Sequence, residues 1–542
     1  MSSKRTLKGS ASSSQRRVVV IGGGLSGITA GIALQRDLKL QNFTIYEKSD
    51  ALGGTWKYNT YPGCRSDIGT HWYSLSTELN PDWSESHVLQ TQLLAYWQGI
   101  AHKHHLHSHV QFNSKVTEIV WDDGQQVYHM IVQDVLTGET RRDHANAVIC
   151  AMGPLDVPHY PEDLRGVLTK FKGVQFHSAR WDHSVDLRGK RVAVIGNGCS
   201  ATQFVPHIVK DPTNQVVSFC RQPKWIVPFS GVKEYSQFRR RLFRVLPFVL
   251  RLYRWYLYFR GESLYRFIHS GGKYKKSREA AQDRVRAYMK ARTLEKYHDM
   301  IIPDTPLGCQ RLIINYGYLE ALNAPNHTLN YDGIAEVTEN GIMTKKGESL
   351  EFDIIIMGTG FVVERYPIDI KGVNGKSLHQ YHQEQGGPTA YRGVTTPGFP
   401  NLYMIAGPNT ATGHGSAVFS TEVETDYIVQ MLKPVLSGDA SSFDVTEEAT
   451  TAWNDALQKR LSTSVWSYCQ SWYRVGHTKK ITVIWPGNMT EFWWMLRRPI
   501  WKDYRAVDAE RWERKMRTAK VSRAVRITIS VLGITPSHGY NM

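Results

Sequence analysis

Two short segments of the chain carry glycine at a spacing that lets a backbone wrap closely around a phosphate group. The first is Gly22-Gly23-Gly24-Leu25-Ser26-Gly27 and the second is Gly196-Asn197-Gly198-Cys199-Ser200-Ala201. Glycine permits a tight turn, and a helix that begins there points its N-terminus at the phosphate. A purely structural turn is the alternative for such a pattern taken alone. The candidate phosphate-binding residues are Gly22, Gly24, Gly27, Gly196, Gly198, Ser200 and Ala201.

The sequence around each glycine-rich segment favours a complete dinucleotide-binding unit over an isolated turn. The β-branched runs 17–21 and 191–195 predict buried parallel strands directly before the glycines. A helical segment follows each, and the next strand-like runs are 43–46 and 216–220. This order of elements predicts an α/β fold that contains two Rossmann-like domains.

The residues that end the second strand of each unit have opposite charges. Glu47 ends the first, about 20 residues after Gly27, where a carboxylate accepts hydrogen bonds from a ribose 2′-hydroxyl. Arg221 ends the other and would bind a 2′-phosphate, which an acid would repel. We therefore expect FAD at the first site and NADPH at the second. A solvated surface charge is the alternative for Arg221.

A segment between the two glycine-rich loops has the pattern F-x-G-x-x-x-H-x-x-x-W-D. Its defining residues are Phe171, Gly173, His177 and Trp181. Together with the two loops, this pattern resembles the fingerprint of the flavin-dependent Baeyer–Villiger monooxygenases. Related flavin monooxygenases carry Tyr or Phe at the position of Trp181. The resemblance extends from about Arg17 to Trp501, and segments 469–474 and 485–487 resemble the subgroup of 4-hydroxyacetophenone monooxygenase.

The resemblance implies a specific domain organisation. It places an NADPH domain (156–335) inside a discontinuous FAD domain formed by residues 17–155 and 336–542. The strand-like runs at 353–357 and 402–406 are expected to return the chain to the FAD domain. A helical insertion is expected at about 230–300, inside the NADPH domain. Residues 1–16, which are rich in Ser and basic residues, are predicted to form a disordered tail.

A second motif of the same family lies between Gly53 and Asp67. It contains Thr55 and Trp56 and ends in Tyr-Pro-Gly-Cys-Arg-Ser-Asp. The resemblance implies that Thr55, Trp56, Asp67 and Tyr73 line the flavin and that Val116 meets the adenine through its backbone. It likewise implies that Gln203, Gln222 and Gln310 belong to the NADPH site.

The segment Gly308-Cys309-Gln310-Arg311 resembles a family motif that usually reads G-C-K-R and supplies the catalytic arginine. Gln310 stands where the family has a lysine that contacts the 2′-phosphate, and Asn315 replaces an acid downstream. Arg311 is retained, whereas the preference for NADPH over NADH loses one expected contact. A surface role is the alternative for Arg311.

The family chemistry explains why an arginine is needed. The resemblance implies a C4a-peroxyflavin that attacks a ketone and inserts one oxygen atom from O2 to give an ester or lactone. Arg311 would keep the peroxide ionised, because a guanidinium stays charged at any working pH. It would also stabilise the oxyanion of the tetrahedral intermediate. Asp67 would orient Arg311 through a carboxylate–guanidinium pair.

His177 lies in the linker where the two domains join, which favours a role in domain closure over acid–base catalysis. A purely packing role for His177 is the alternative. Five histidines between 102 and 109 match no metalloenzyme spacing, so we expect a solvated cluster and no metal.

The composition is that of an ordinary globular protein, with 41% hydrophobic and 21% charged residues among 542. Six scattered cysteines contain no C-x-x-C pair, which argues against a disulfide framework, a zinc site and a dithiol reductase. No apolar run suggests a signal peptide or membrane span, so we expect a cytoplasmic protein that is not secreted. The net charge of +17 is consistent with cofactor phosphates or an anionic membrane surface, and no nucleic-acid module is present.

Arginines alternate with large apolar residues between 237 and 268. Two interpretations are open: a peripheral membrane segment, or a helical insertion that caps the active site with its arginines in solvent. We favour the second. For the whole chain, the alternatives to ketone oxygenation are oxygenation of nitrogen or sulfur in a small molecule, and a nucleotide-binding scaffold without oxygenase activity.

Overall fold

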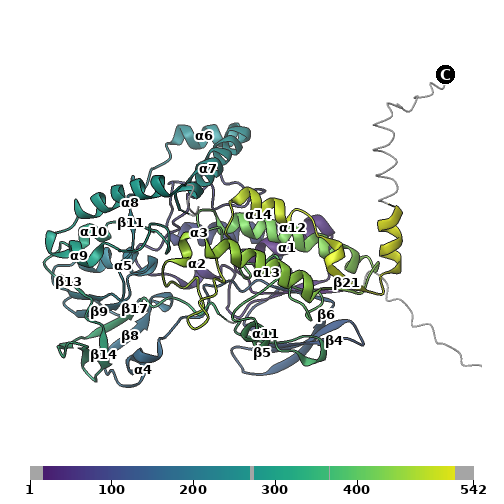
Figure 1. Ribbon diagram of the computed structural model, residues 1–542, viewed down its shortest axis with the longest axis horizontal. Helices are drawn as coiled ribbons and strands as arrows, with labels where there is room; N and C mark the ends of the chain where they lie inside the picture. Colours follow the sequence, from purple (N-terminus) through teal and green to yellow (C-terminus); the bar gives the residue numbers. More distant parts are fainter. Residues whose placement is uncertain (1–15, 269–273, 365, 519–542) are drawn as a thin grey trace, which may run out of the picture.

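The computed structural model describes residues 16–268, 274–364 and 366–518 (Figure 1). Its first unit is built on a parallel sheet with the strand order β19-β7-β1-β2-β3. The strands are β1 (Val18–Ile21), β2 (Phe43–Tyr46), β3 (Val110–Gln111), β7 (Ala147–Cys150) and β19 (Leu402–Met404). Helices α1 (Leu25–Leu38), α3 (Gln90–Lys103) and α12 (Ala417–Leu436) pack together on this unit. Every residue of β1 and β7 is buried, as expected for a central parallel strand.

The second unit is built on a parallel sheet with the order β13-β10-β9-β17-β8. Its strands are β8 (Val174–His177), β9 (Arg191–Ile195), β10 (Gln215–Phe219), β13 (His327–Asn330) and β17 (Ile354–Met357), and α5 (Cys199–Val209) follows β9. Together the two sheets confirm the predicted α/β fold with two Rossmann-like units.

One predicted strand lies in the other unit. The run 353–357 was expected to return the chain to the first sheet, but β17 pairs with β8 and β9 of the second. The prediction is wrong because a fully apolar strand such as Ile354–Met357 suits the centre of either parallel sheet. The run 402–406 does return, since β19 pairs with β7.

Smaller elements complete the two units. A four-stranded sheet contains β4 (Ser114–Asp122), β5 (Val127–Asp134), β6 (Thr140–Ala145) and β18 (Asp369–Lys371). A three-stranded sheet contains β14 (Ile334–Val337), β15 (Gly341–Thr344) and β16 (Ser349–Glu351). Two strand pairs are β11 (Ile226–Val227) with β12 (Ile313–Ile314), and β20 (Ser442–Val445) with β21 (Tyr504–Val507). Short helices are α2 (Thr55–Tyr58), α4 (Gly166–Thr169), α9 (His298–Ile301), α10 (Tyr318–Ala321) and α11 (Leu378–Glu384).

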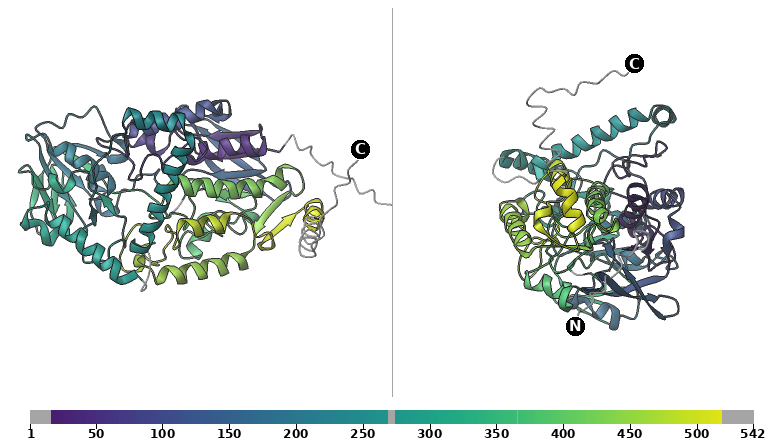
Figure 2. Two further views of the ribbon diagram at one scale, coloured as in Figure 1. Left: turned by 90° about the horizontal axis from the view of Figure 1, so that it is seen from above. Right: turned by 90° about the vertical axis from the view of Figure 1, so that its right-hand side faces the viewer.

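Five further helices lie outside the two parallel sheets. They are α6 (Gln237–Val245), α7 (Pro247–Ile268), α8 (Lys275–Lys290), α13 (Glu447–Ser462) and α14 (Met489–Leu496). Pro247 opens α7, a position where its missing N–H costs nothing. Seen from above, α7 crosses the molecule between the two units (Figure 2). It is anchored by Arg254, which is buried and donates hydrogen bonds to the carbonyls of His71 and Ser74.

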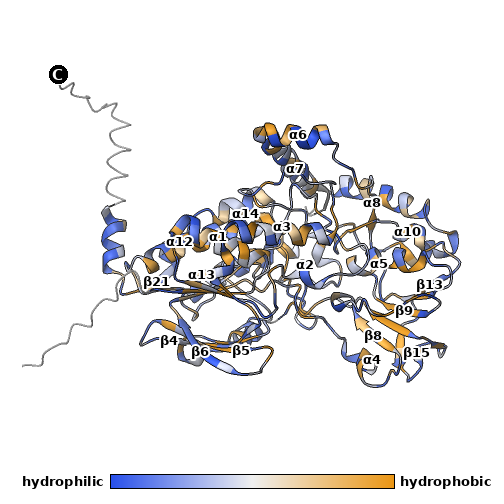
Figure 3. Cartoon of the chain, turned by 180° about the vertical axis from the view of Figure 1, so that it is seen from behind, coloured by the Kyte–Doolittle hydropathy of each residue, from blue (hydrophilic) through white to orange (hydrophobic). Residues whose placement is uncertain are grey.

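The outer face of α7 differs from the favoured expectation of apolar residues on the core and arginines in solvent. Five large side chains at helical spacing are each more than half exposed: Phe248, Leu252, Trp255, Tyr256 and Phe259. Arg254, in contrast, is 8% exposed. Figure 3 shows that α6 and α7 stand out from the body and mix hydrophobic with hydrophilic residues. The prediction is wrong for these five residues, because side chains on the opposite face, such as that of Arg254, anchor α7 to the body.

The structure also corrects the expectation about cysteines. Cys309 and Cys469 form a disulfide, with their Cα atoms 6.0 Å apart. They are separated by 160 residues, so no local spacing could indicate the pair. Cys64, Cys150, Cys199 and Cys220 are free.

The sequence also led to expectations about membrane-spanning helices, metal ligands and the two ends of the chain. Among the described residues, no helix is long and apolar enough to cross a membrane, and no group of acidic, Cys and His residues could hold a metal ion. The histidines between 102 and 109 lie at the end of α3 and before β4. Residues 1–15 of the predicted tail and the residues from 519 onward lie outside the described part of the chain.

The first glycine-rich turn leaves no room for a side chain at Gly27. A Cβ atom there would collide with the carbonyl oxygen of Gly22, whereas a Cβ at Gly198 would have no atom within 4 Å. We expect Gly27→Ala to lower the melting temperature by about 1–3 °C, since overpacking of this kind costs about 1–3 kcal/mol. Gly198→Ala, the matched control, should melt like the wild type in a calorimetric scan. Equal melting temperatures for all three proteins would contradict this account of the turn.

Candidate active site

A cavity of about 2330 Å³ lies between the carboxyl ends of the two parallel sheets. Both glycine-rich loops, the motif that ends at Asp67 and the segment around Arg311 contribute to its wall. The predicted site residues that line it are Gly22, Gly24, Glu47, Thr55, Trp56, Asp67, Tyr73, Val116, Gly196, Gly198, Ser200, Gln203, Arg221, Gln222, Gln310 and Arg311. Segments far apart in the sequence thus meet where open α/β sheets bind their ligands.

Six predicted residues lie outside the cavity wall. Gly27 and Ala201 occupy the last position of their glycine-rich loops, where a small residue lets the helix pack closely on its strand. The other four are the linker residues Phe171, Gly173, His177 and Trp181. Their contribution to the site is therefore indirect.

The first glycine-rich loop is built to receive an anion and a ribose. Helix α1 begins after Gly24 without a side-chain cap, so its first N–H groups remain available to a phosphate. Gly24 closely approaches Gly54, and a Cβ on Gly54 would lie 2.7 Å from the Cα of Gly24. Glu47 is buried and accepts hydrogen bonds from the backbone N–H groups of Gly23 (2.6 Å) and Ser49 (2.8 Å). These bonds fix the carboxylate at the cavity wall.

The motif after Gly53 supplies aromatic walls and an unpaired donor. Trp56 and Tyr73 are buried and meet edge to face, with their ring centroids 5.6 Å apart. The indole N–H of Trp56 has no hydrogen-bond partner within the described chain, although buried donors are normally paired. Val116, on β4, is also buried at the cavity. A flat heterocycle with acceptor atoms fits this surface.

The second glycine-rich loop, like the first, leads into a helix with an uncapped start. Helix α5 begins after Gly198, again without a side-chain cap. Gln203, on the first turns of α5, accepts hydrogen bonds from the Tyr61 hydroxyl and the Arg65 N–H, both at 3.2 Å. It also donates to the Arg65 carbonyl at 3.2 Å. Besides lining the cavity, Gln203 therefore fastens the second unit to the motif of the first.

A cationic cluster of Arg221 and Lys224 lies beyond this loop. The sequence had suggested a role for Arg221 but none for Lys224. The Lys224 ammonium donates a hydrogen bond to Gln310 Oε1 at 2.6 Å. Gln310 in turn donates to Gln222 Oε1 at 3.0 Å. Burial, together with the neighbouring charge of Arg221, lowers the pKa of Lys224 to about 8. Two cations with amide partners form a site for an anion.

Arg311 lies where three segments meet. Its Nη2 atom is 3.5 Å from Asp67 Oδ2, and its Nη1 atom donates a hydrogen bond to the Gly413 carbonyl at 3.0 Å. Burial alone would lower the pKa of Arg311, but Asp67 and other neighbours raise it above its ordinary value. Burial raises the pKa of Asp67, while Arg311 opposes that rise. The arrangement holds a cation at the cavity wall; the catalytic role expected for Arg311 stays a prediction.

Two further residues of the cavity wall, Tyr473 and Glu424, were not predicted from the sequence. Tyr473 is buried next to Arg311, and burial raises the pKa of its hydroxyl to about 12. Glu424, on α12, is fully buried at the cavity and accepts a hydrogen bond from the Ala406 N–H at 2.9 Å. Burial raises the pKa of Glu424 to about 8.

The linker residues pack at the edge of the second sheet. His177 ends β8 and is 1% exposed, and its Nδ1 accepts a hydrogen bond from the Ala179 N–H at 3.1 Å. Burial lowers the pKa of His177 to about 4, so its ring is neutral near pH 7. Trp181 packs against Phe176 and Phe204, each with ring centroids 5.1 Å apart. Neither side chain reaches Arg311, which agrees with a structural or conformational role.

Asn315 has a local role. Its Oδ1 accepts hydrogen bonds from the N–H groups of Gly317 and Leu319, both at 3.2 Å. It thereby stabilises the turn into α10 instead of contacting the cavity.

The chain is similar in sequence to known flavin monooxygenases. A family model described as flavin-binding monooxygenase-like matches residues 15–238. A Baeyer–Villiger monooxygenase from Pseudomonas aeruginosa is 36% identical over 485 residues, which are 88% of this chain and 88% of that protein. A Baeyer–Villiger monooxygenase from Streptomyces coelicolor is 34% identical over 483 residues, 88% of this chain and 90% of that protein.

Solved structures share the fold. The closed crystal structure of cyclohexanone monooxygenase is similar with a TM-score of 0.77 and 23% identity, covering 91% of this chain and 99% of that one. An oxidised steroid monooxygenase bound to NADP is similar with a TM-score of 0.74 and 24% identity, covering 91% and 99%.

Proposed function

Since the chain belongs to the family of flavin-dependent Baeyer–Villiger monooxygenases, we propose that it inserts one oxygen atom from O2 next to the carbonyl of a ketone. The product is an ester or a lactone. The observation that carries this proposal is the Arg311 guanidinium, held at the cavity wall by Asp67 and the Gly413 carbonyl.

We assign FAD to the first unit and NADPH to the second. The uncapped start of α1, the fixed carboxylate of Glu47 and the unpaired indole N–H of Trp56 fit a flavin dinucleotide. The uncapped start of α5 and the cations of Arg221 and Lys224 fit a nucleotide with a 2′-phosphate. When bound, the flavin supplies the oxygen-activating redox chemistry that no amino-acid side chain offers.

Arg311 supplies the electrostatic part of the reaction. A fixed cation stabilises negative charge that develops on the ketone oxygen during attack, and it requires no proton transfer to do so. Asp67 is a positioning residue, because it acts by orienting Arg311 through their ion pair. Tyr473 closes the wall beside the guanidinium and excludes water, which strengthens the interaction.

Oxygenation of nitrogen or sulfur is the alternative reaction. That reaction uses an electrophilic oxidant and does not require a cation to stabilise an oxyanion. Arg311 therefore favours the ketone as substrate. Trp181 favours it for a separate reason, because related flavin monooxygenases carry Tyr or Phe at that position.

The substitution Arg311→Ala should separate oxygenation from the earlier steps. We expect this variant to retain bound flavin and its reduction by NADPH, while oxygenated product falls by about 10²–10³-fold or more. Asp67→Asn should lose less, because Arg311 keeps its hydrogen bond to Gly413. The measurement is product formed per NADPH consumed, followed by mass spectrometry. Ester formation by Arg311→Ala at the wild-type rate would overturn the assignment.

Lys224 and Arg221 should set the preference for a 2′-phosphate. A hydrogen bond to a charged group contributes about 1.5–3 kcal/mol, so Lys224→Gln should weaken NADP⁺ binding by about ten- to a hundredfold. Arg221→Ala should likewise raise the KM for NADPH far more than that for NADH. NAD⁺ binding, measured by calorimetry, is the control and should not change.

The pH dependence of this binding follows from the pKa of Lys224. That residue is charged below about pH 8 and loses its proton above it. NADP⁺ affinity of the wild type should therefore fall as the pH rises through about 8, and less so for Lys224→Gln. Equal losses for NADP⁺ and NAD⁺ would remove the phosphate role.

We also propose that α6 and α7 contact an anionic membrane surface. The exposed stripe on α7, consisting of Phe248, Leu252, Trp255, Tyr256 and Phe259, is flanked by the exposed residues Arg251 and Arg260. No acidic residue occurs between 237 and 261. An interfacial helix of this kind inserts aromatic side chains while its arginines bind lipid phosphates. Two copies of the chain would instead bring like charges together.

Sedimentation with lipid vesicles tests this contact. The wild type should bind phosphatidylglycerol vesicles and be released by salt, whereas phosphatidylcholine should bind it weakly. The double variant Leu252→Glu/Phe259→Glu should not bind. Leu136→Glu is the matched control, because Leu136 is 77% exposed in a turn on the four-stranded sheet. Wild-type protein that stays in the supernatant with both lipids would refute the contact.

Finer assignments complete the proposal. We place the chain near the subgroup of 4-hydroxyacetophenone monooxygenase, supported by segment 469–474, every residue of which lines the cavity. An aryl ketone is therefore the substrate class that we favour. The domain limits 17–155, 156–335 and 336–542 remain predictions, apart from β17, which pairs within the second sheet. The cytoplasmic location also remains a prediction.

A further inference from the structure

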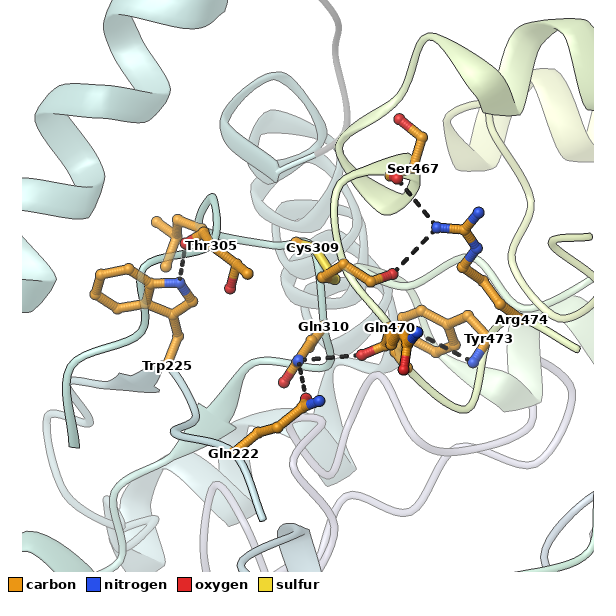
Figure 4. Close-up of a disulfide and its surroundings, with 12 residues drawn as sticks. Gln222, Trp225, Thr305, Cys309, Gln310, Ser467, Gln470, Tyr473 and Arg474 are labelled. Atoms are coloured by element: carbon orange, nitrogen blue, oxygen red, sulfur yellow. Dashed lines mark hydrogen bonds between the residues drawn. A yellow bond between two sulfur atoms is a disulfide. The ribbon is translucent and has the colours of Figure 1, made fainter. Parts of the chain in front are cut away.

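The disulfide between Cys309 and Cys469 joins two distant segments at the active-site wall (Figure 4). Cys309 directly precedes Gln310 and Arg311 in the sequence. Cys469 opens the segment 469–474, which forms the facing part of the same cavity wall. The bridge therefore lies next to the residue to which we assign the electrostatic role.

Few other contacts join the two segments at this point. Gln310 donates a hydrogen bond to the Gln470 carbonyl at 3.2 Å, beside the bridge. Arg474 donates to the carbonyls of Ser467 (3.0 Å) and Cys469 (3.3 Å), but these bonds stay within the C-terminal segment. Figure 4 shows Gln310, Gln470 and Tyr473 grouped on one side of the bridge. The covalent link is thus the main tie between this loop and the arginine segment.

The two sulfur atoms differ in access. Cys309 is fully buried, whereas Cys469 is 6% exposed and lines the cavity. A thiol reagent that enters the cavity therefore reaches Cys469 first. The free cysteines are Cys64, Cys150, Cys199 and Cys220. Cys199 is half-buried and lines the cavity, the other three are buried, and burial raises the pKa of each thiol to about 12. They are poor partners for exchange, because the thiolate is the reactive form.

We propose that the Cys309–Cys469 bridge is a reversible thiol-exchange site that couples the oxygenation reaction to the supply of a dithiol reductant. One thiolate of the reductant attacks Cys469 Sγ, the sulfur–sulfur bond breaks, and Cys309 leaves as a thiolate that takes up a proton. The second thiol of the reductant then displaces Cys469 and closes its own disulfide. The protein gains two electrons and two protons, and the reductant loses them.

The consequence of reduction follows from the position of the loop. With the bridge closed, Tyr473 is held beside Arg311 and the cavity wall is complete. With the bridge open, the first residues of the segment 469–474 lose their covalent tie and can move to admit water to the reacting groups, while the Thr482 N–H still donates to the Tyr473 carbonyl at 2.9 Å. The oxidised protein should therefore convert NADPH into oxygenated product efficiently. The reduced protein should waste NADPH as hydrogen peroxide.

The first experiment counts thiols and depends on no enzymatic activity. The folded protein is purified without reductant, treated with oxidised glutathione and then denatured, and it should show four free thiols. After treatment with dithiothreitol it should show six. Hydrogen exchange of the segment 469–474 should be faster in the reduced form. Six thiols after oxidation, or unchanged exchange after reduction, would overturn the proposal even if the enzyme oxygenates ketones.

The second experiment rests on the proposed function. Product per NADPH should fall several-fold on reduction of the wild type and recover when oxidised glutathione is added. The double variant Cys309→Ser/Cys469→Ser should behave like the reduced wild type and should not respond to either reagent. Cys150→Ser, which removes a buried thiol of β7 that does not line the cavity, should respond like the wild type. An equal response of the double variant would refute the role of the bridge. Absence of any oxygenated product would instead count against the proposed function and leave the thiol count intact.

Discussion

Arg311 keeps a positive charge at a wall where burial works against it, and much of the site is arranged around that constraint. Asp67 supplies the opposing charge from the first unit, and the Gly413 carbonyl supplies a second acceptor from the chain after β19. The Arg311 side chain is 32% exposed, and a half-buried cation without such partners is disfavoured. The pair can form only when the two parallel sheets face each other across one cavity. Gln203 contributes to that arrangement by joining α5 to the motif that ends at Asp67.

Much of this arrangement was predictable from the sequence because it depends on short-range patterns. The strands before each glycine-rich loop, the loops themselves and Glu47 are local features whose geometry follows from backbone sterics. The placement of Asp67 beside Arg311 came from a family resemblance and not from spacing, because the two residues are distant in the sequence. The structure brings them within 3.5 Å of each other.

The features that the sequence did not reveal share a physical cause, since each depends on long-range packing. β17 suits either sheet by composition, and only pairing with β8 and β9 decides between them. The bridge between Cys309 and Cys469 spans 160 residues. The role of Lys224 emerges from its contact with Gln310, which stands where the family carries a lysine. The exposed face of α7 likewise depends on how the helix is anchored, chiefly by the buried guanidinium of Arg254.

Insertion of one oxygen atom between a carbonyl carbon and its neighbouring carbon is the central step, and isotope labelling tests it most directly. Purified protein would be supplied with NADPH, an aryl ketone and ¹⁸O2, and the products analysed by mass spectrometry. An ester that contains one labelled oxygen atom per molecule is the predicted result. Labelled hydrogen peroxide without ester, accompanied by labelled sulfoxide from an added thioether, would contradict the role assigned to Arg311 and favour heteroatom oxygenation.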